Sequence, residues 1–143
     1  MRETIDYHIK STWLNIFKMY NQIASKFDTS QATGAVLLNI EKEGTPSTKI
    51  AKNIGLEATS LSRILKNLED QNLIYKKTDH VDKRVSLVFL TEKGIKKRKI
   101  AKQIVSGFNE KIVQSIPQSK LSVFYEVMEN INKIVEAYKK ENL

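Results

Sequence analysis

The sequence predicts a mainly α-helical chain with one small β-hairpin, and two observations carry this prediction. Apolar residues recur at steps of three and four along most of the 143 residues, which is the spacing of one face of an α-helix. Between residues 73 and 90 this pattern gives way to two short runs of β-branched and aromatic residues, with a polar stretch between them. We therefore expect a single hairpin inside a chain of helices.

Length and composition exclude several classes of protein. The length suits one domain, and 41% hydrophobic with 28% charged residues is typical of a folded chain. Cysteine is absent, which removes disulfides, thiol chemistry and cysteine-ligated metal sites. No apolar run approaches the ~20 residues needed to span a bilayer, and the first ten residues are too charged for a signal peptide. We expect a cytoplasmic protein that does not contact a membrane.

The sequence offers no set of residues for catalysis or metal binding. His8 and His80 lie in different segments, and neither has a second ligand at the spacing of a zinc site. No Ser-His-Asp set, glycine-rich phosphate loop or usefully spaced carboxylate pair can be assembled. We predict no metal, no cofactor and no enzymatic activity.

The positive charge is concentrated in the middle of the chain. Residues 47–99 carry thirteen basic and six acidic side chains, whereas residues 1–46 are balanced and residues 100–143 have an excess of one basic side chain. A basic segment between two nearly neutral flanks favours a nucleic-acid partner over a general solubility device.

The N-terminal part predicts two helices. Apolar residues from Ile5 to Phe27 form one stripe of a long helix. Residues 28–30 then supply an N-cap for a second helix, which we expect Gly44 and Pro46 to end.

Two shorter helices and a hairpin follow. Ser47 can cap a helix that Gly55 stops, and Ala58–Gln71 forms the next, with Asn72 in the left-handed conformation at its end. This helix-turn-helix pattern leads into the hairpin, or wing, of residues 73–90. Helical spacing resumes after Thr91 and breaks at Pro117, after which Ser119 can cap a last helix.

Residues 47–94 carry a family likeness. The stretch Leu73–Arg84 (LIYKKTDHVDKR), followed by Leu90–Gly94 (LTEKG), resembles the wing of the MarR family of winged helix-turn-helix regulators. Two departures are Asn72 in place of a glycine, and Lys76 in place of the arginine that opens the wing. The resemblance implies a winged helix-turn-helix core at residues 29–99, flanked by dimerisation helices at 1–28 and 100–143. Together these would form one MarR-like domain spanning 1–143.

The helix Ala58–Gln71 is the candidate recognition helix. Short hydroxyls beside a guanidinium can read base edges in the DNA major groove. The candidate contacts on this helix are Thr59, Ser60, Ser62, Arg63 and Lys66.

The wing and the preceding helix supply further candidate DNA contacts. On the wing these are Lys76, Lys77, Lys83 and Arg84, of which the last two suit a narrow minor groove. We expect Asp82 to pair with Arg84, or with nearby backbone, and so to fix the shape of the wing. Ser47 and Lys49 are candidate phosphate contacts.

The long terminal helices predict a second copy of the chain. Their apolar stripes are too long for the winged core to cover, so burial in a two-fold homodimer is expected. The resemblance implies a ligand-responsive repressor that binds double-stranded DNA at a pseudo-palindromic operator. It also implies an aromatic or amphipathic small-molecule effector, for which His8, Trp13, Phe17 and Tyr20 are the candidate pocket residues. Two alternatives stay open: a winged-helix module that binds protein, and a sequence-neutral, nucleoid-type DNA binder.

Overall fold

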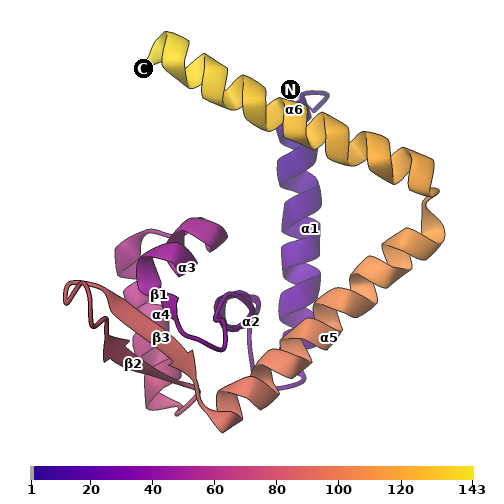
Figure 1. The fold of residues 1–143 in the computed structure, drawn as a ribbon. Coiled ribbons are helices and arrows are strands. Elements are labelled where there is room, and N and C mark those ends of the chain that lie inside the picture. The colour runs from indigo at the N-terminus through magenta and orange to yellow at the C-terminus, as the bar shows by residue number, and fades with distance from the viewer. Residues whose placement is uncertain (1) are drawn as a thin grey trace. The chain divides into compact units, whose positions relative to one another are not determined.

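A computed structural model describes residues 2–143, which form two compact units divided in the sequence between Val105 and Ser106 (Figure 1). The first unit contains α1 (Ile5–Ser25), α2 (Gln31–Leu38), β1 (Thr45–Pro46), α3 (Ser47–Ile54), α4 (Ala58–Asp70), β2 (Ile74–Thr78), β3 (Ser86–Leu90) and the first part of α5 (Glu92–Ser115). The second contains the rest of α5 and α6 (Gln118–Asn142). Among these residues no helix is both long and apolar enough to cross a membrane.

The predicted fold class is confirmed, with one strand more than the sequence indicated. The three strands form an antiparallel sheet in the order β1-β3-β2. Thr45 pairs with Val88 and Pro46 with Leu87, so β1 adds an edge to the expected hairpin. A two-residue strand that contains proline leaves no alternating pattern, and proline is tolerated there because the strand lies at the edge of the sheet.

Helix α2 is shorter than predicted. Ser30 caps its start as expected, because the Ser30 hydroxyl accepts a hydrogen bond from the Thr33 N–H at 3.1 Å. The helix ends at Leu38 and not near Gly44, because the Asn39 side chain donates to the Ala35 carbonyl at 2.8 Å and so caps the last turn. Ile40 then leaves the helix and enters the core.

The helix-turn-helix is formed by α3 and α4. Gly55 ends α3, as predicted, and does so with φ 68°. Asn72 follows α4 with φ 58°, which is the left-handed conformation that the sequence predicted for it. Two predicted caps are wrong by one or two residues. Pro46 precedes α3 and Pro117 precedes α6, which places Ser47 and Ser119 inside the first turns.

A single hydrophobic core holds the winged region together. It is formed by α2, α3, α4 and the inner face of the sheet. Its buried members are Val36, Leu37, Ile40, Ile50, Leu61, Leu65, Leu68, Leu73, Ile74 and Val88. Because one face of α4 is committed to this core, its other face is left on the surface.

The start of α5 packs directly on the chain between α4 and β2. The Thr91 N–H donates to the Leu73 carbonyl at 3.1 Å, and the Thr91 hydroxyl donates to the Asn72 carbonyl at 2.7 Å. The same hydroxyl accepts from the Gly94 N–H at 3.0 Å, which confirms Thr91 as the predicted cap of α5. At Gly94 a Cβ would lie 1.9 Å from the Leu73 carbonyl oxygen, so only glycine fits. We call this contact the α5 joint.

Basic side chains of α5 hold three other helix ends. Lys93 donates to the Gln71 carbonyl after α4 at 3.1 Å, and Lys97 to the Phe27 carbonyl after α1 at 2.7 Å. Arg98 donates to the Leu37 carbonyl at 3.1 Å, at the end of α2. Cations at helix C-termini satisfy carbonyls that have no partner within the helix and oppose the negative end of the helix dipole.

The second unit leaves most of its apolar side chains on the surface. Leu121 is the buried residue of α6, whereas Phe124, Ile134 and Tyr138 are more than half exposed. In the first unit, α1 likewise buries Ala24 while Ile5 stays 66% exposed. Within its own unit, each of these helices therefore carries an exposed apolar stripe.

The α5 joint predicts opposite effects for two alanine substitutions. Gly94→Ala should destabilise the fold by about 1–3 kcal/mol or more, because the new methyl group meets backbone that cannot easily move. Gly107→Ala is the matched control: a Cβ there meets nothing within 4 Å, and a helix-interior position should gain about 0.5–1 kcal/mol. Urea unfolding at one protein concentration measures both. Equal stabilities for the two variants would contradict the close approach at Leu73.

Candidate nucleic-acid interface

Helix α4 presents the predicted recognition residues on its outer face. Thr59, Ser60, Ser62, Arg63 and Lys66 are all exposed. Leu61, Leu65 and Leu68 lie buried on the opposite face. The amphipathic spacing therefore brings the predicted hydroxyls and cations onto one surface of one helix.

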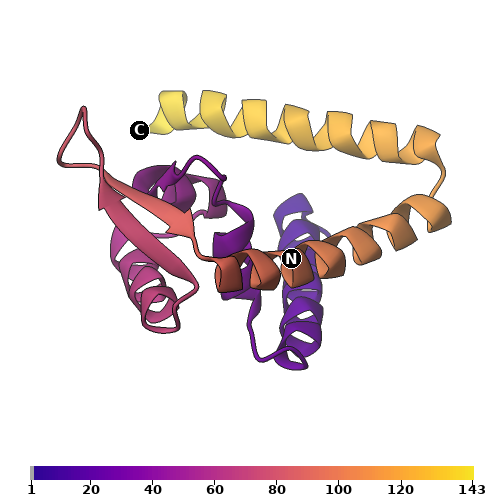
Figure 2. The ribbon, with the colours of Figure 1, turned by 60° about the horizontal axis from the view of Figure 1, so that its bottom comes forward.

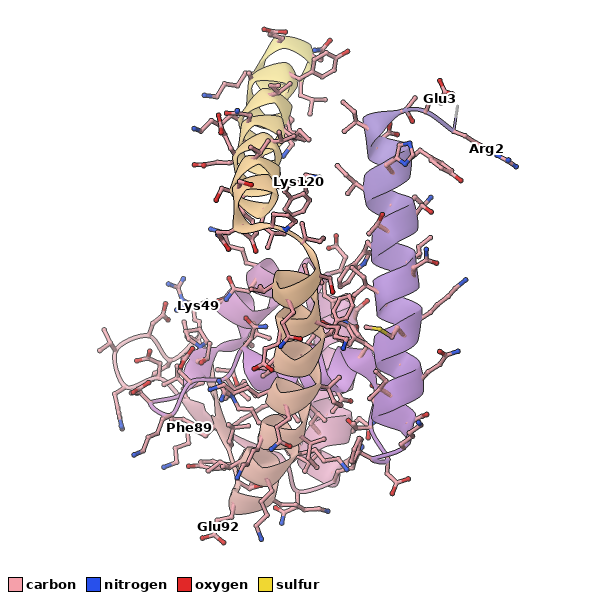
Figure 3. All side chains as sticks on the ribbon, turned by 90° about the vertical axis from the view of Figure 1, so that its right-hand side faces the viewer. Arg2, Glu3, Lys49, Phe89, Glu92 and Lys120 are labelled. Carbon is pink, nitrogen blue, oxygen red and sulfur yellow. The ribbon has the colours of Figure 1, made fainter. Side chains whose placement is uncertain are left out.

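The start of α4 is open to an anion. Glu57, at the N-cap position, makes no side-chain hydrogen bond to the first N–H groups of the helix. A helix N-terminus in this state offers N–H donors and the positive end of the helix dipole to phosphate oxygens. On α3, Lys49 is exposed (Figure 3). Ser47, at the start of the same helix, is half-buried.

The wing extends beyond the helices that precede it. The loop between β2 and β3 reaches past the ends of α3 and α4 in both ribbon views (Figures 1 and 2). It carries Lys83 and Arg84 on the surface, with the Arg84 side chain 91% exposed. The predicted tip cations are therefore free of the core.

The two lysines of β2 serve different faces of the sheet. Lys76 pairs with the buried Val88 and Lys77 with Leu87, so alternation sends them to opposite sides. The Lys77 ammonium lies 5.7 Å from the ring centres of both Tyr75 and Phe89. The sequence grouped these two lysines as one set of contacts, and the structure separates them.

The ion pair expected at the wing tip is present. Asp82 accepts from Arg84 through both carboxylate oxygens, Oδ1 from Nε at 3.1 Å and Oδ2 from Nη2 at 3.2 Å. Asp82 Oδ1 also accepts from the Arg84 backbone N–H at 3.0 Å. The side-chain and backbone hydrogen bonds from Arg84 hold the pKa of Asp82 below its ordinary value of 3.8.

The structure divides the four residues predicted to line a ligand pocket. Trp13 and Phe17 line a cleft of about 610 Å³ between α1, α2, α3 and α4. Tyr20 lines a separate cavity of about 100 Å³ beside Gly34 and Ala101. His8 belongs to neither lining; it is exposed on α1, with its ring edge-on to Tyr7. One predicted pocket thus becomes two cavities and one surface residue.

No cluster for a metal ion is found within residues 2–143, where no three His, Cys, Asp or Glu side chains come together. The first unit contains an exposed polar helix, a helix packed before it and a basic hairpin. These are the parts of a winged helix-turn-helix protein.

Comparison with known proteins finds a family match for the winged region and a relative over most of the chain. A model of the MarR family matches residues 29–86. The chain is 24% identical over 123 residues to the HTH-type transcriptional regulator TcaR of Staphylococcus aureus (strain Newman), which spans 85% of this chain and 82% of that protein. The match to the MarR family model covers the winged region, between α1 and α5, and does not include the long terminal helices.

Two solved structures are similar in fold over nearly the whole chain. One is the S. aureus MepR–DNA complex, with a TM-score of 0.78, 22% identity, and coverage of 94% of this chain and 98% of that one. The other is CouR from Rhodococcus jostii RHA1 bound to p-coumaroyl-CoA, with a TM-score of 0.79, 20% identity, and coverage of 90% and 92%. Both support the winged-helix fold.

The ion pair at the wing tip makes a titration prediction. In wild type the Asp82 carboxyl should titrate below 3.8, so the pair is complete above that pH and is lost as the pH falls through the depressed value. Arg84→Gln should raise the Asp82 pKa part of the way back, because the backbone hydrogen bond stays. Lys83→Gln removes a neighbouring charge without removing a hydrogen bond to Asp82 and should change the pKa less. NMR titration of the side-chain carboxyl carbon measures all three, and an equal effect of the two variants would contradict the pairing.

Proposed function

We propose that this protein is a sequence-specific, double-stranded DNA-binding transcriptional regulator. The observation that carries the proposal is the outer face of α4, where Ser62 and Arg63 stand exposed on a helix whose other face is fixed in the core. The basic wing lies in the same compact unit. TcaR, the curated relative, is itself a transcriptional regulator.

The residues divide into two kinds of DNA contact. In the proposed complex α4 enters the major groove, where Thr59, Ser60, Ser62, Arg63 and Lys66 face base edges and nearby phosphates. Lys83 and Arg84 reach the minor groove from the wing tip, while Asp82 keeps Arg84 in place. Ser47, Lys49, Lys76 and Lys77 contact phosphates, which sets the position of the protein but not its sequence preference.

The protein acts in this proposal as a homodimer. Residues 29–99 form the DNA-binding region, and residues 1–28 and 100–143 supply the dimerisation helices of one domain. The exposed apolar stripes of α1 and α6 support this, since burying them requires a partner surface. Two recognition helices related by a two-fold axis would read a pseudo-palindromic operator.

A small-molecule effector completes the proposal. We assign it to the Trp13–Phe17 cleft, whose 610 Å³ suits an aromatic or amphipathic molecule. Binding there would act on repression only through a difference in affinity between two conformations. The proposal includes no cofactor and no enzymatic activity, and it places the protein in the cytoplasm with its DNA.

DNA binding across sequences and salt concentrations tests the proposal. A regulator protects a short pseudo-palindrome and keeps its preference while affinity falls log-linearly with salt. Equal affinity for scrambled DNA would instead identify a sequence-neutral binder. Absence of DNA binding would identify a protein-interaction module.

Two substitutions separate base reading from phosphate contact. Arg63→Ala should cost about 1–3 kcal/mol of discrimination between the operator and single-base variants, because a guanidinium can pair bidentately with guanine. Lys49→Ala should weaken binding to all sequences alike and reduce the salt slope by about one. Lys140→Ala, on the exposed end of α6, is the control. Fluorescence anisotropy with labelled duplexes measures each, and a preference unchanged in Arg63→Ala would show that α4 is not the reading helix.

Dimerisation predicts a mass change when α6 is altered. Phe124, Val127, Ile131, Ile134 and Tyr138 follow one stripe of α6, and Ile134 is 64% exposed. Ile134→Glu should convert a dimer into a monomer, because it buries an unpaired charge in the interface. Asn132→Glu lies on the other face and should leave the dimer intact. Sedimentation equilibrium measures both masses, and a monomeric wild type would refute the dimer.

A further inference from the structure

We propose that a second cleft, on the outer face of the wing, binds a planar aromatic anion. This cleft measures about 530 Å³ and shares no lining residue with the Trp13–Phe17 cleft. It lies between the base of the wing, the chain at residues 40–42 and the first part of α5, all within the first unit. The proposal does not depend on DNA binding.

Stacked aromatic rings form one wall of the cleft. Tyr75 and Phe89 are paired across β2 and β3, and their ring centres lie 5.2 Å apart at an interplanar angle of 10°. They occupy the face of the sheet opposite to the buried Ile74 and Val88. Tyr75 is 41% exposed, and the Lys77 ammonium lies 5.7 Å from the centres of both rings. The part of the Tyr75 ring that Lys77 leaves open can contact another flat, apolar group.

The backbone beneath Phe89 is shaped to this ring. Gly44 has φ 89°, and a Cβ at this position would lie 2.5 Å from Phe89 Cζ. The chain at Gly44 therefore packs directly against the Phe89 ring and limits how far this ring can move. Figure 3 labels Phe89, which lies beside the first part of α5.

Cations surround the rest of the cleft. Ile95, Arg98, Lys99 and Lys102 follow one stripe of α5 and line the cleft, together with Lys42 from the chain between α2 and β1. Glu41 is the single carboxylate in the lining. In the part of the chain that is described, Lys42, Lys99 and Lys102 have no ion-pair partner. Four cations against one anion leave a strongly positive cleft.

Arg98 is the fixed member of this group. Its Nε and Nη2 donate to the carbonyls of Leu37 and Leu38, which holds the guanidinium at the end of α2. A guanidinium has five N–H donors, so it keeps donors that an anion can use. A preorganised guanidinium with flexible ammonium groups beside it suits a carboxylate.

Aromatic walls with a cationic rim select an amphipathic anion. A flat apolar body gains contact with Tyr75 and Phe89, and its carboxylate gains charge-assisted hydrogen bonds from α5 and Lys42. A neutral molecule of the same shape would keep the contact with the rings but would lose the charge-assisted hydrogen bonds.

Binding of 2-naphthoate to the full-length protein, measured by calorimetry, tests this site. Wild type should bind, and 2-naphthol, the neutral analogue, should bind at least about 10-fold more weakly because it lacks the charge. The double variant K42Q/K102Q should weaken 2-naphthoate binding at least about 10-fold. K96Q/K140Q removes the same charge from exposed positions outside the cleft and should bind like wild type.

NMR shifts distinguish this site from the Trp13 cleft. On titration with 2-naphthoate the amides of Gly44 and Phe89 should shift in wild type and not in K42Q/K102Q, whereas the indole N–H of Trp13, the single tryptophan, reports only on the other cleft. Equal binding of 2-naphthol, unchanged binding in K42Q/K102Q, or a shift confined to Trp13 would each overturn the proposal. So would a loss in K42Q/K102Q of affinity for DNA alone, which would make these lysines phosphate contacts.

Discussion

The winged region depends on the backbone contact at the α5 joint. Leu73 directly follows Asn72, whose backbone is left-handed. The Leu73 carbonyl packs against Gly94 and accepts a hydrogen bond from the Thr91 N–H. This one point joins the end of α4, the start of the wing and the start of α5. Because the contact is backbone on backbone, with no side chain that can rotate away, a displacement of the start of α5 must be carried into α4 and the wing together.

The basic side chains of residues 47–99 do not all lie on one surface that faces a nucleic acid. Lys93, Lys97 and Arg98 belong to the strongly basic segment 47–99, yet each donates to the carbonyls at the end of another helix. They bind helix ends of this chain, where they offset the negative ends of α4, α1 and α2. The basic side chains that we propose for nucleic-acid contact lie on α3, the outer face of α4, β2 and the wing tip.

Periodicity and local chemistry made most of this architecture predictable. The stripes of α4, the left-handed Gly55 and Asn72, and the Asp82–Arg84 pair all depend on neighbours within a few residues, and each is found. What could not be predicted depends on distant contacts. The strand β1 exists only because Thr45 and Pro46 meet β3, and α2 stops early where Asn39 closes it. Helical spacing could not show that Trp13 and Phe17 line one cleft and Tyr20 a neighbouring cavity, since that depends on what α2 packs against each of them. The helical spacing of Arg98, Lys99 and Lys102 can be read from the sequence. No local pattern predicts that they line one cleft with Tyr75 and Phe89.

The two faces of the wing make different contacts. Alternation along β2 sends Ile74 and Lys76 to one side and Tyr75 and Lys77 to the other, so a single strand meets the core on one face and the aromatic cleft on the opposite one. The tip is closed by its own hydrogen bonds between Asp82 and Arg84, which involve no residue of the cleft. An anion held between the base of the wing and α5 would then act on where the hairpin points, and the shape of its tip would stay the same. Since α5 is also tied to α4 through Gly94, such a ligand would bear on both proposed DNA-contacting elements from a site that touches neither the exposed face of α4 nor the tip.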